Sequence, residues 1–110
     1  MQPTVPEIEP VLLGEKLSSA EPPLLIDVRQ PDEIAIAKIE GAKLVPMGEV
    51  MERIEEFEGD RDAVVFCRSG VRSARVIEFL ESRGHEGRLY NLVGGILAWS
   101  DHIDPSVPKY

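Results

Sequence analysis

The stretch from Cys67 to Ser73, CRSGVRS, combines residue types that could carry out nucleophilic chemistry. It holds the only cysteine of the chain, flanked by Arg68 and Arg72, with Gly70 between the two arginines. If the loop curls around the sulfur, its backbone N–H groups and the start of the following helix point at one spot and form a site for an anion. Gly70 allows that curl. Because such surroundings favour a thiolate over a thiol, we expect Cys67 to be a nucleophile at neutral pH.

The spacing within this loop bears on which group it could hold. A cysteine that ends a buried strand is often only a small hydrophobic side chain, but two arginines and a glycine at the start of a helix favour a functional one. In cysteine phosphatases the loop between cysteine and arginine is one residue longer and holds a phosphate or arsenate oxyanion. Here four residues separate Cys67 from Arg72, so the tighter loop fits a smaller group, such as the outer sulfur of a persulfide. The spacing favours sulfur transfer, with a small cysteine phosphatase or arsenate reductase as the alternative.

The cysteine count sets a further condition on the mechanism. With no second thiol in the chain, a persulfide on Cys67 cannot be resolved as an internal disulfide, so the acceptor has to come from outside. We therefore predict an open, exposed site. His85 and His102 lie far apart in the sequence and no Cys/His cluster has zinc spacing, so we expect neither a metal nor a cofactor.

Length and charge exclude several classes of protein. A chain of 110 residues is the size of one domain, and we predict a single domain over 1–110 with extended ends at 1–10 and 104–110. The net charge of −8 argues against nucleic acid or an anionic membrane as a partner. Residues 63–90 are the exception, with five basic and three acidic side chains. The start of the chain shows no signal peptide or membrane span, so we expect a cytoplasmic protein.

Strands and helices alternate along the predicted chain. Apolar runs predict strands at 24–28, 43–46, 63–67 and 87–92. Helical spacing and capping residues predict helices at 11–19, 31–40, 47–60, 73–84 and 94–102. Apolar strands that alternate with helices indicate an α/β fold with a mostly parallel sheet of about five strands, covered by helices on both faces. Asp27, Arg29 and Cys67 fall at the carboxyl ends of strands, where sites form in such sheets.

Three stretches together resemble a single-domain rhodanese, a member of the sulfurtransferase family. They are LLIDVRQPDEIAIAKIEGAKLVPM at 24–47, VVFCRSGVRSARVIEFLESRG at 64–84 and LYNLVGGILAW at 89–99, so the resemblance covers nearly the whole chain. It implies the rhodanese fold. It also implies that Cys67 takes sulfane sulfur from a donor, becomes a persulfide and passes the sulfur to an acceptor nucleophile.

The resemblance also assigns roles around the cysteine. It implies that the persulfide is held by the loop residues Arg68, Ser69, Gly70, Val71, Arg72 and Ser73. Asp27 and Arg29 resemble family residues near the loop, where they either support it as an ion pair or contact substrate directly. A non-catalytic binding module with the rhodanese fold is a further alternative, which an intact Cys67 with both arginines disfavours.

The C-terminal stretch GGILAWSDHIDPSVPKY, residues 94–110, is similar to the end of the rhodanese module attached to adenylyltransferases of the molybdopterin and thiamine pathways. This resemblance implies a sulfur donor such as thiosulfate or a cysteine desulfurase. The acceptor would be a thiol or a sulfur-carrier protein ending in Gly-Gly, and an adenylyltransferase is a possible partner.

Overall fold

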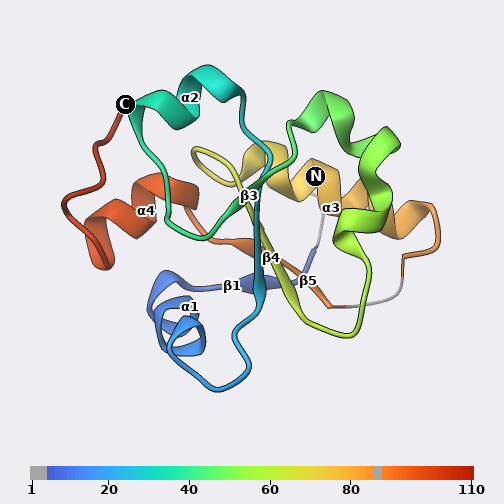
Figure 1. The fold of residues 1–110 in the computed structure, drawn as a ribbon, viewed down its shortest axis with the longest axis horizontal. Helices are drawn as coiled ribbons and strands as arrows, with labels where there is room; N and C mark the ends of the chain where they lie inside the picture. The colour runs from blue at the N-terminus through green and yellow to red at the C-terminus, as the bar shows by residue number, and fades with distance from the viewer. Residues whose placement is uncertain (1–4, 86–87) are drawn as a thin grey trace.

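The computed structural model describes residues 5–85 and 88–110 (Figure 1). Its sheet has five strands, all paired in parallel, in the spatial order β1-β5-β4-β2-β3. The strands are β1 Glu7–Ile8, β2 Leu24–Asp27, β3 Lys43–Leu44, β4 Ala63–Phe66 and β5 Leu89–Leu92. The predicted parallel α/β sheet is confirmed. Gly87, where the last predicted strand begins, lies outside the described residues.

Helices cover both faces of this sheet, as predicted. They are α1 Pro10–Leu17, α2 Pro31–Ile36, the 3₁₀ helix η1 Met47–Phe57, α3 Val71–Ser82 and α4 Gly95–His102. α1 and α4 pack together on one side of the sheet, and α3 and η1 pack together on the other (Figure 1). Over the described ranges, none of these helices is both long and apolar enough to span a bilayer.

The sequence of the central strand β4 is apolar throughout because both of its faces are buried. Side chains alternate along a strand, so Ala63 and Val65 face α3 and η1 while Val64 and Phe66 face α1 and α4. All four are buried, because helices cover both faces of a parallel sheet. Cys67 continues the alternation and joins the cluster on the α3 side.

Residues near both ends of the described part of the chain pack against the rest of the fold. Ile8 in β1 pairs with Leu92, which adds an edge strand that is too short to show a periodic pattern in the sequence. At the other end, a segment expected to be extended turns at Asp104, whose carbonyl accepts a hydrogen bond from the Val107 N–H at 3.0 Å. The turn lets Val107 enter the core, and the chain then runs to Tyr110 beside α2 (Figure 1).

The segment predicted as an α-helix over 47–60 is instead η1, and this prediction was wrong in type. Val50 and Phe57 are buried as the spacing predicted, but the backbone makes 3₁₀ turns and leaves helical geometry at Arg53. Glu49, Glu52 and two further glutamates crowd these eleven residues. Like charges three or four residues apart destabilise a regular α-helix.

The helix predicted to end at Gly41 ends at Ile36. Ala37 is extended, with φ −155° and ψ 141°, and its carbonyl accepts a hydrogen bond from Arg29 Nη2 at 2.7 Å. A buried guanidinium that needs acceptors therefore competes with helix continuation at this point.

Candidate active site

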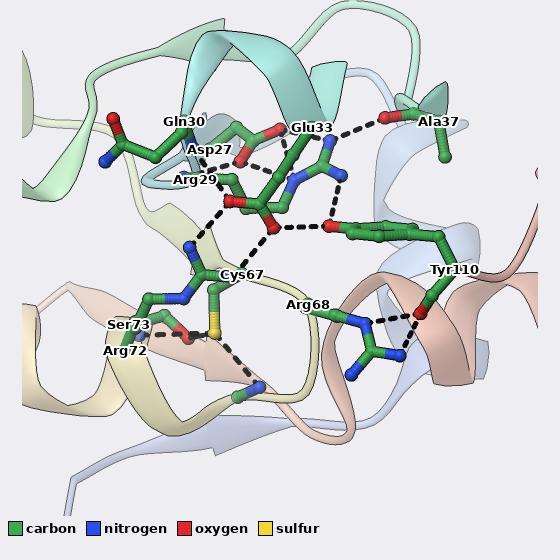
Figure 2. Close-up of polar contacts among 11 residues, drawn as sticks. Asp27, Arg29, Gln30, Glu33, Ala37, Cys67, Arg68, Arg72, Ser73 and Tyr110 are labelled. Atoms are coloured by element: carbon green, nitrogen blue, oxygen red, sulfur yellow. Dashed lines mark hydrogen bonds and ion pairs between the residues drawn. The ribbon is translucent and has the colours of Figure 1, made fainter. Parts of the chain in front are cut away.

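Cys67 lies directly after the central strand β4, at the carboxyl edge of the sheet (Figure 2). The chain then turns through Arg68 and Ser69 to Gly70, and α3 starts at Val71. Gly70 has φ +102°, in the left-handed region that glycine adopts without strain. That conformation directs the Gly70 N–H back to the sulfur, 3.1 Å away.

Two further donors reach the same sulfur from the first turn of α3. The Ser73 backbone N–H lies 3.4 Å from Sγ, and the Ser73 hydroxyl oxygen lies 3.3 Å from it. Both groups approach from the N-terminus of a twelve-residue helix, where the helix dipole favours negative charge. The loop therefore surrounds Sγ with hydrogen-bond donors that stabilise an anionic sulfur.

The prediction of an exposed site was wrong for the sulfur itself. Cys67 is 1% exposed, whereas Arg68, Ser69 and Val71 on the outside of the loop are exposed. The cause is the alternation of β4, which turns the Cys67 side chain inward into the core cluster beneath α3. The loop has an accessible rim, and the thiol lies below it.

Asn91 in β5 is a part of the site that sequence reasoning missed. Its Oδ1 lies 2.6 Å from the Ser73 hydroxyl, and its Nδ2 donates to the Gly70 carbonyl at 3.0 Å. The Ser73 hydroxyl has one proton, so it donates either to Asn91 or to Sγ at a given moment. Asn91 thus orients two loop residues that contact the sulfur. The available signal was one polar side chain in the apolar run of β5.

The start of α4 holds the first residues of the loop by their carbonyls. The Ile96 N–H donates to the Cys67 carbonyl at 2.9 Å, and the Leu97 N–H donates to the Arg68 carbonyl at 3.2 Å. Gly95 makes this approach possible, because an added Cβ would lie 2.5 Å from the Cys67 carbonyl oxygen and 2.4 Å from that of Arg68.

Replacing Gly95 with alanine is therefore expected to lower the free energy of unfolding by about 1–3 kcal/mol and to reduce the rate of any reaction at Cys67. The added methyl group clashes with backbone atoms, and the φ of +61° at this position disfavours a side chain. Urea unfolding measures the first effect. Gly48→Ala is the matched control, since its Cβ meets no atom within 4 Å and should change stability by less than about 1 kcal/mol. Equal stabilities of the two variants would contradict this account of α4.

Asp27 and Arg29, both predicted near the loop, form a buried ion pair. Arg29 Nη2 lies 2.7 Å from Asp27 Oδ2, and the two side chains are 0% and 1% exposed. Arg29 Nε also donates to both carboxylate oxygens of Asp27. The pair fixes the chain after β2, beside the loop. Because both side chains are buried, they present no surface to solvent.

Arg29 also ties β2 to the end of the chain. Its Nη1 donates to the Tyr110 hydroxyl at 2.8 Å, and its guanidinium lies over the Phe66 ring and the Tyr110 ring. Burial by itself would lower the pKa of Arg29, but the hydrogen bonds to Asp27 and Tyr110 outweigh it and raise the pKa. Arg29 is therefore a permanent cation within the fold.

The two arginines of the loop have different partners. Arg72 makes a bidentate ion pair with Glu33 of α2, with Nη1–Oε1 and Nη2–Oε2 distances of 2.7 and 2.9 Å (Figure 2). Arg68 donates to the Tyr110 carbonyl and lies over the Tyr110 ring. Glu33 and Tyr110 were not singled out from the sequence, since both lie far along the chain from the loop.

Glu33 is the centre of this network. It accepts hydrogen bonds from Arg72, from the Gln30 N–H at 3.0 Å and from the Tyr110 hydroxyl at 2.7 Å. The hydrogen bonds from Arg72 are the main cause that lowers the pKa of Glu33 from 4.5 to about 2, against an opposing effect of burial. The same pair raises the pKa of Arg72.

A pH dependence of stability follows from this carboxylate. Because the pKa of Glu33 is lower in the folded chain, its contribution is complete above about pH 4.5 and is lost as the pH falls toward 2. We expect Glu33→Gln to lower the free energy of unfolding by roughly 2–3 kcal/mol at pH 6, and by progressively less as the pH falls. Urea unfolding of both proteins across this range measures the difference. A difference that stays constant with pH would show that the ion pair is not its source.

The fold and this site place the protein among α/β domains that carry one cysteine after a central parallel strand, in a loop whose donors face the thiol. The chain belongs to the rhodanese-like domain family, which matches residues 11–102. This confirms the resemblance seen in the sequence.

Similar proteins cover nearly all of the chain. A sulfurtransferase of Allochromatium vinosum is 43% identical over 103 residues, 94% of this chain and 95% of that protein. The probable adenylyltransferase/sulfurtransferase MoeZ of Mycobacterium tuberculosis is 36% identical over 105 residues, 94% of this chain but 26% of MoeZ. A rhodanese-like domain protein from Staphylococcus aureus has a crystal structure with a TM-score of 0.80 at 32% identity, covering 96% of this chain and 99% of that one. These relatives support sulfur transfer as the general activity.

Proposed function

We propose that the protein moves sulfane sulfur through a persulfide on Cys67, from a donor to an external acceptor. The observation that carries this proposal is the set of hydrogen-bond donors around Sγ. They are the Gly70 N–H, the Ser73 N–H and the Ser73 hydroxyl, all within 3.4 Å of the sulfur. The loop residues from Arg68 to Ser73 would hold the persulfide. Asp27 and Arg29 support that loop through Tyr110, which contacts both Arg29 and Arg68.

The reaction has two displacement steps, and neither step needs an oxidant or a reductant. In the first, the Cys67 thiolate attacks the outer sulfur of the donor, a new S–S bond forms, and the donor fragment leaves with the electron pair of the broken bond. In the second, an acceptor nucleophile attacks the outer sulfur of the persulfide, and the electron pair returns to Sγ. The hydrogen-bond donors around Sγ stabilise the thiolate as the leaving group in the second step.

The acceptor is external, because the chain has one cysteine and cannot resolve the persulfide internally. We propose a thiol or a Gly-Gly-terminated sulfur-carrier protein in this role, with sulfur incorporation into molybdopterin or thiamine as the pathway. The similarity to MoeZ and the sequence of the C-terminal stretch support this choice, and they make an adenylyltransferase a candidate partner. Thiosulfate and a cysteine desulfurase are the candidate donors.

Intact mass spectrometry tests the proposal. The protein is reduced, incubated with thiosulfate or with a cysteine desulfurase and cysteine, and weighed before and after addition of a thiol. We expect a gain equal to one sulfur atom, which the thiol then removes. A protein that gains no sulfur from either donor would overturn the proposal.

A further inference from the structure

The charge of the loop arginine nearest the thiol is already balanced. Arg72 is paired through both terminal nitrogens with Glu33, whose side chain is 14% exposed. The Tyr110 hydroxyl donates to the same carboxylate at 2.7 Å, which fixes Glu33 in place. Arg72 and Glu33 together therefore present almost no net charge to a group that approaches the loop.

The other loop arginine is directed away from the sulfur. Figure 2 shows the Arg68 guanidinium on the outer side of the loop, turned toward Tyr110, while Sγ points to Gly70 and Ser73 on the inner side. Hydrogen bonds to the Tyr110 carbonyl and the contact with its ring, 5.2 Å from the Arg68 Cζ, hold it there.

A third arginine, Arg75, lies one turn further along α3. It lines a hollow on the β1 side of the loop together with Ser69, Gly70 and the acidic Glu7. The charges of Arg75 and Glu7 offset each other in that hollow, so it presents little net positive charge beside the loop. The donors that face Sγ are the uncharged N–H and O–H groups of Gly70 and Ser73.

From this arrangement we propose that Glu33 selects the sulfur donor: by neutralising Arg72, it makes the site favour persulfides, with at most one negative charge, over the dianion thiosulfate. This inference rests on the proposed function and concerns only its first step. A dianion that approaches a thiolate on a protein of net charge −8 is repelled unless a free cation compensates. The uncharged hydrogen-bond donors of Gly70 and Ser73 are sufficient to stabilise a persulfide. Glu33 is thus a positioning residue that acts through Arg72.

Both sulfur donors give a persulfide on Cys67, and they differ in the charge of their leaving groups. With a persulfide R–S–SH, the thiolate attacks the outer sulfur and R–S⁻ leaves with the electron pair, while the proton stays on the transferred sulfur. With thiosulfate, the thiolate attacks the outer sulfur and sulfite leaves with the electron pair. Three negative charges therefore meet in the second case before any bond breaks, and one or two in the first.

The test compares the wild type with Glu33→Gln and Glu40→Gln. Loading of Cys67 is followed by intact mass over a range of concentrations of thiosulfate and, separately, of cysteine persulfide, whose net charge is at most −1. We expect Glu33→Gln to free the charge of Arg72 and to lower the KM for thiosulfate about tenfold, with kcat changed less than about twofold. The KM for cysteine persulfide should change less than about twofold. Glu40→Gln removes the same charge from a side chain that is 88% exposed and pairs with Lys38, and it should leave all values as in the wild type.

The outcomes separate this inference from the proposed function. A wild type that neither donor loads would overturn the proposed function. A wild type that both donors load with equal kcat/KM, or a KM for thiosulfate that Glu33→Gln leaves unchanged, would overturn the role of Glu33 alone.

A measurement on the wild type covers the case in which Glu33→Gln does not fold. If no free cation attracts thiosulfate, added salt should screen the repulsion from the acidic protein and raise kcat/KM for this donor. A fall in kcat/KM with salt would show a free cation at the site and overturn the inference.

Discussion

Cys67→Ser is expected to gain no sulfur from any donor, and its rate of sulfur transfer should fall by at least about 10³-fold. A serine hydroxyl stays protonated at neutral pH and cannot replace the thiolate as nucleophile, nor can it hold a persulfide. Intact mass after incubation with donor measures the first effect, and release of sulfite from thiosulfate measures the second.

The interpretation of that result depends on an intact fold. Serine is close in size to cysteine, and at this position its hydroxyl meets the Gly70 N–H and the Ser73 side chain as hydrogen-bonding partners. We therefore expect Cys67→Ser to unfold at nearly the wild-type urea concentration. Equal addition of sulfur to wild type and variant would show that the sulfur is carried elsewhere and would refute a Cys67 persulfide.

The largest loss of stability is expected from Asp27→Ala, at about 3–5 kcal/mol in the free energy of unfolding. The substitution removes the carboxylate that binds Arg29 Nε and Nη2, and it leaves a guanidinium that is 0% exposed without its counter-ion. Urea unfolding at neutral pH measures the change. Because Arg29 also binds Ala37 and Tyr110, we expect sulfur loading to fall as well.

Two further variants identify the source of that loss. Glu40→Ala removes one partner of the exposed pair with Lys38, and should cost less than about 1 kcal/mol. The double variant Asp27→Leu with Arg29→Met replaces both buried charges by apolar groups and should recover part of the stability lost in Asp27→Ala. A double variant less stable than Asp27→Ala would show that Arg29 stabilises the fold without its counter-ion.

Local patterns in the sequence were sufficient to predict the strands β2, β3, β4 and β5 and the position of the thiol, but not the two-residue edge strand β1. The apolar run before Cys67 and the glycine after it specify a strand followed by a loop, because burial on both faces requires the first and a left-handed turn requires the second. The ion pair of Asp27 with Arg29 was one of the two roles that the family resemblance left open for these residues, and the structure shows the pair.

The partners of the loop could not be predicted in this way. Glu33 meets Arg72 across 39 positions and Tyr110 across 77, so these contacts exist only once the fold brings α2, the loop and the C-terminal segment together. Nothing local marks Glu33 among the many acidic residues of the chain. The burial of the thiol follows from the direction of one side chain at a strand end, which the run of apolar residues before it does not specify.

The buried position of Cys67 bears on how this thiol withstands oxidants. Peroxides convert accessible thiolates to sulfenic and then to irreversibly oxidised sulfinic and sulfonic acids. Here Cys67 is 1% exposed, so an oxidant, like a sulfur donor, has to enter past the rim of the loop to reach Sγ. An S–S bond places the carried atom about 2.05 Å beyond Sγ. The acceptor therefore reacts with the outer sulfur and does not need to contact Sγ, and each delivery returns the thiol to its buried position.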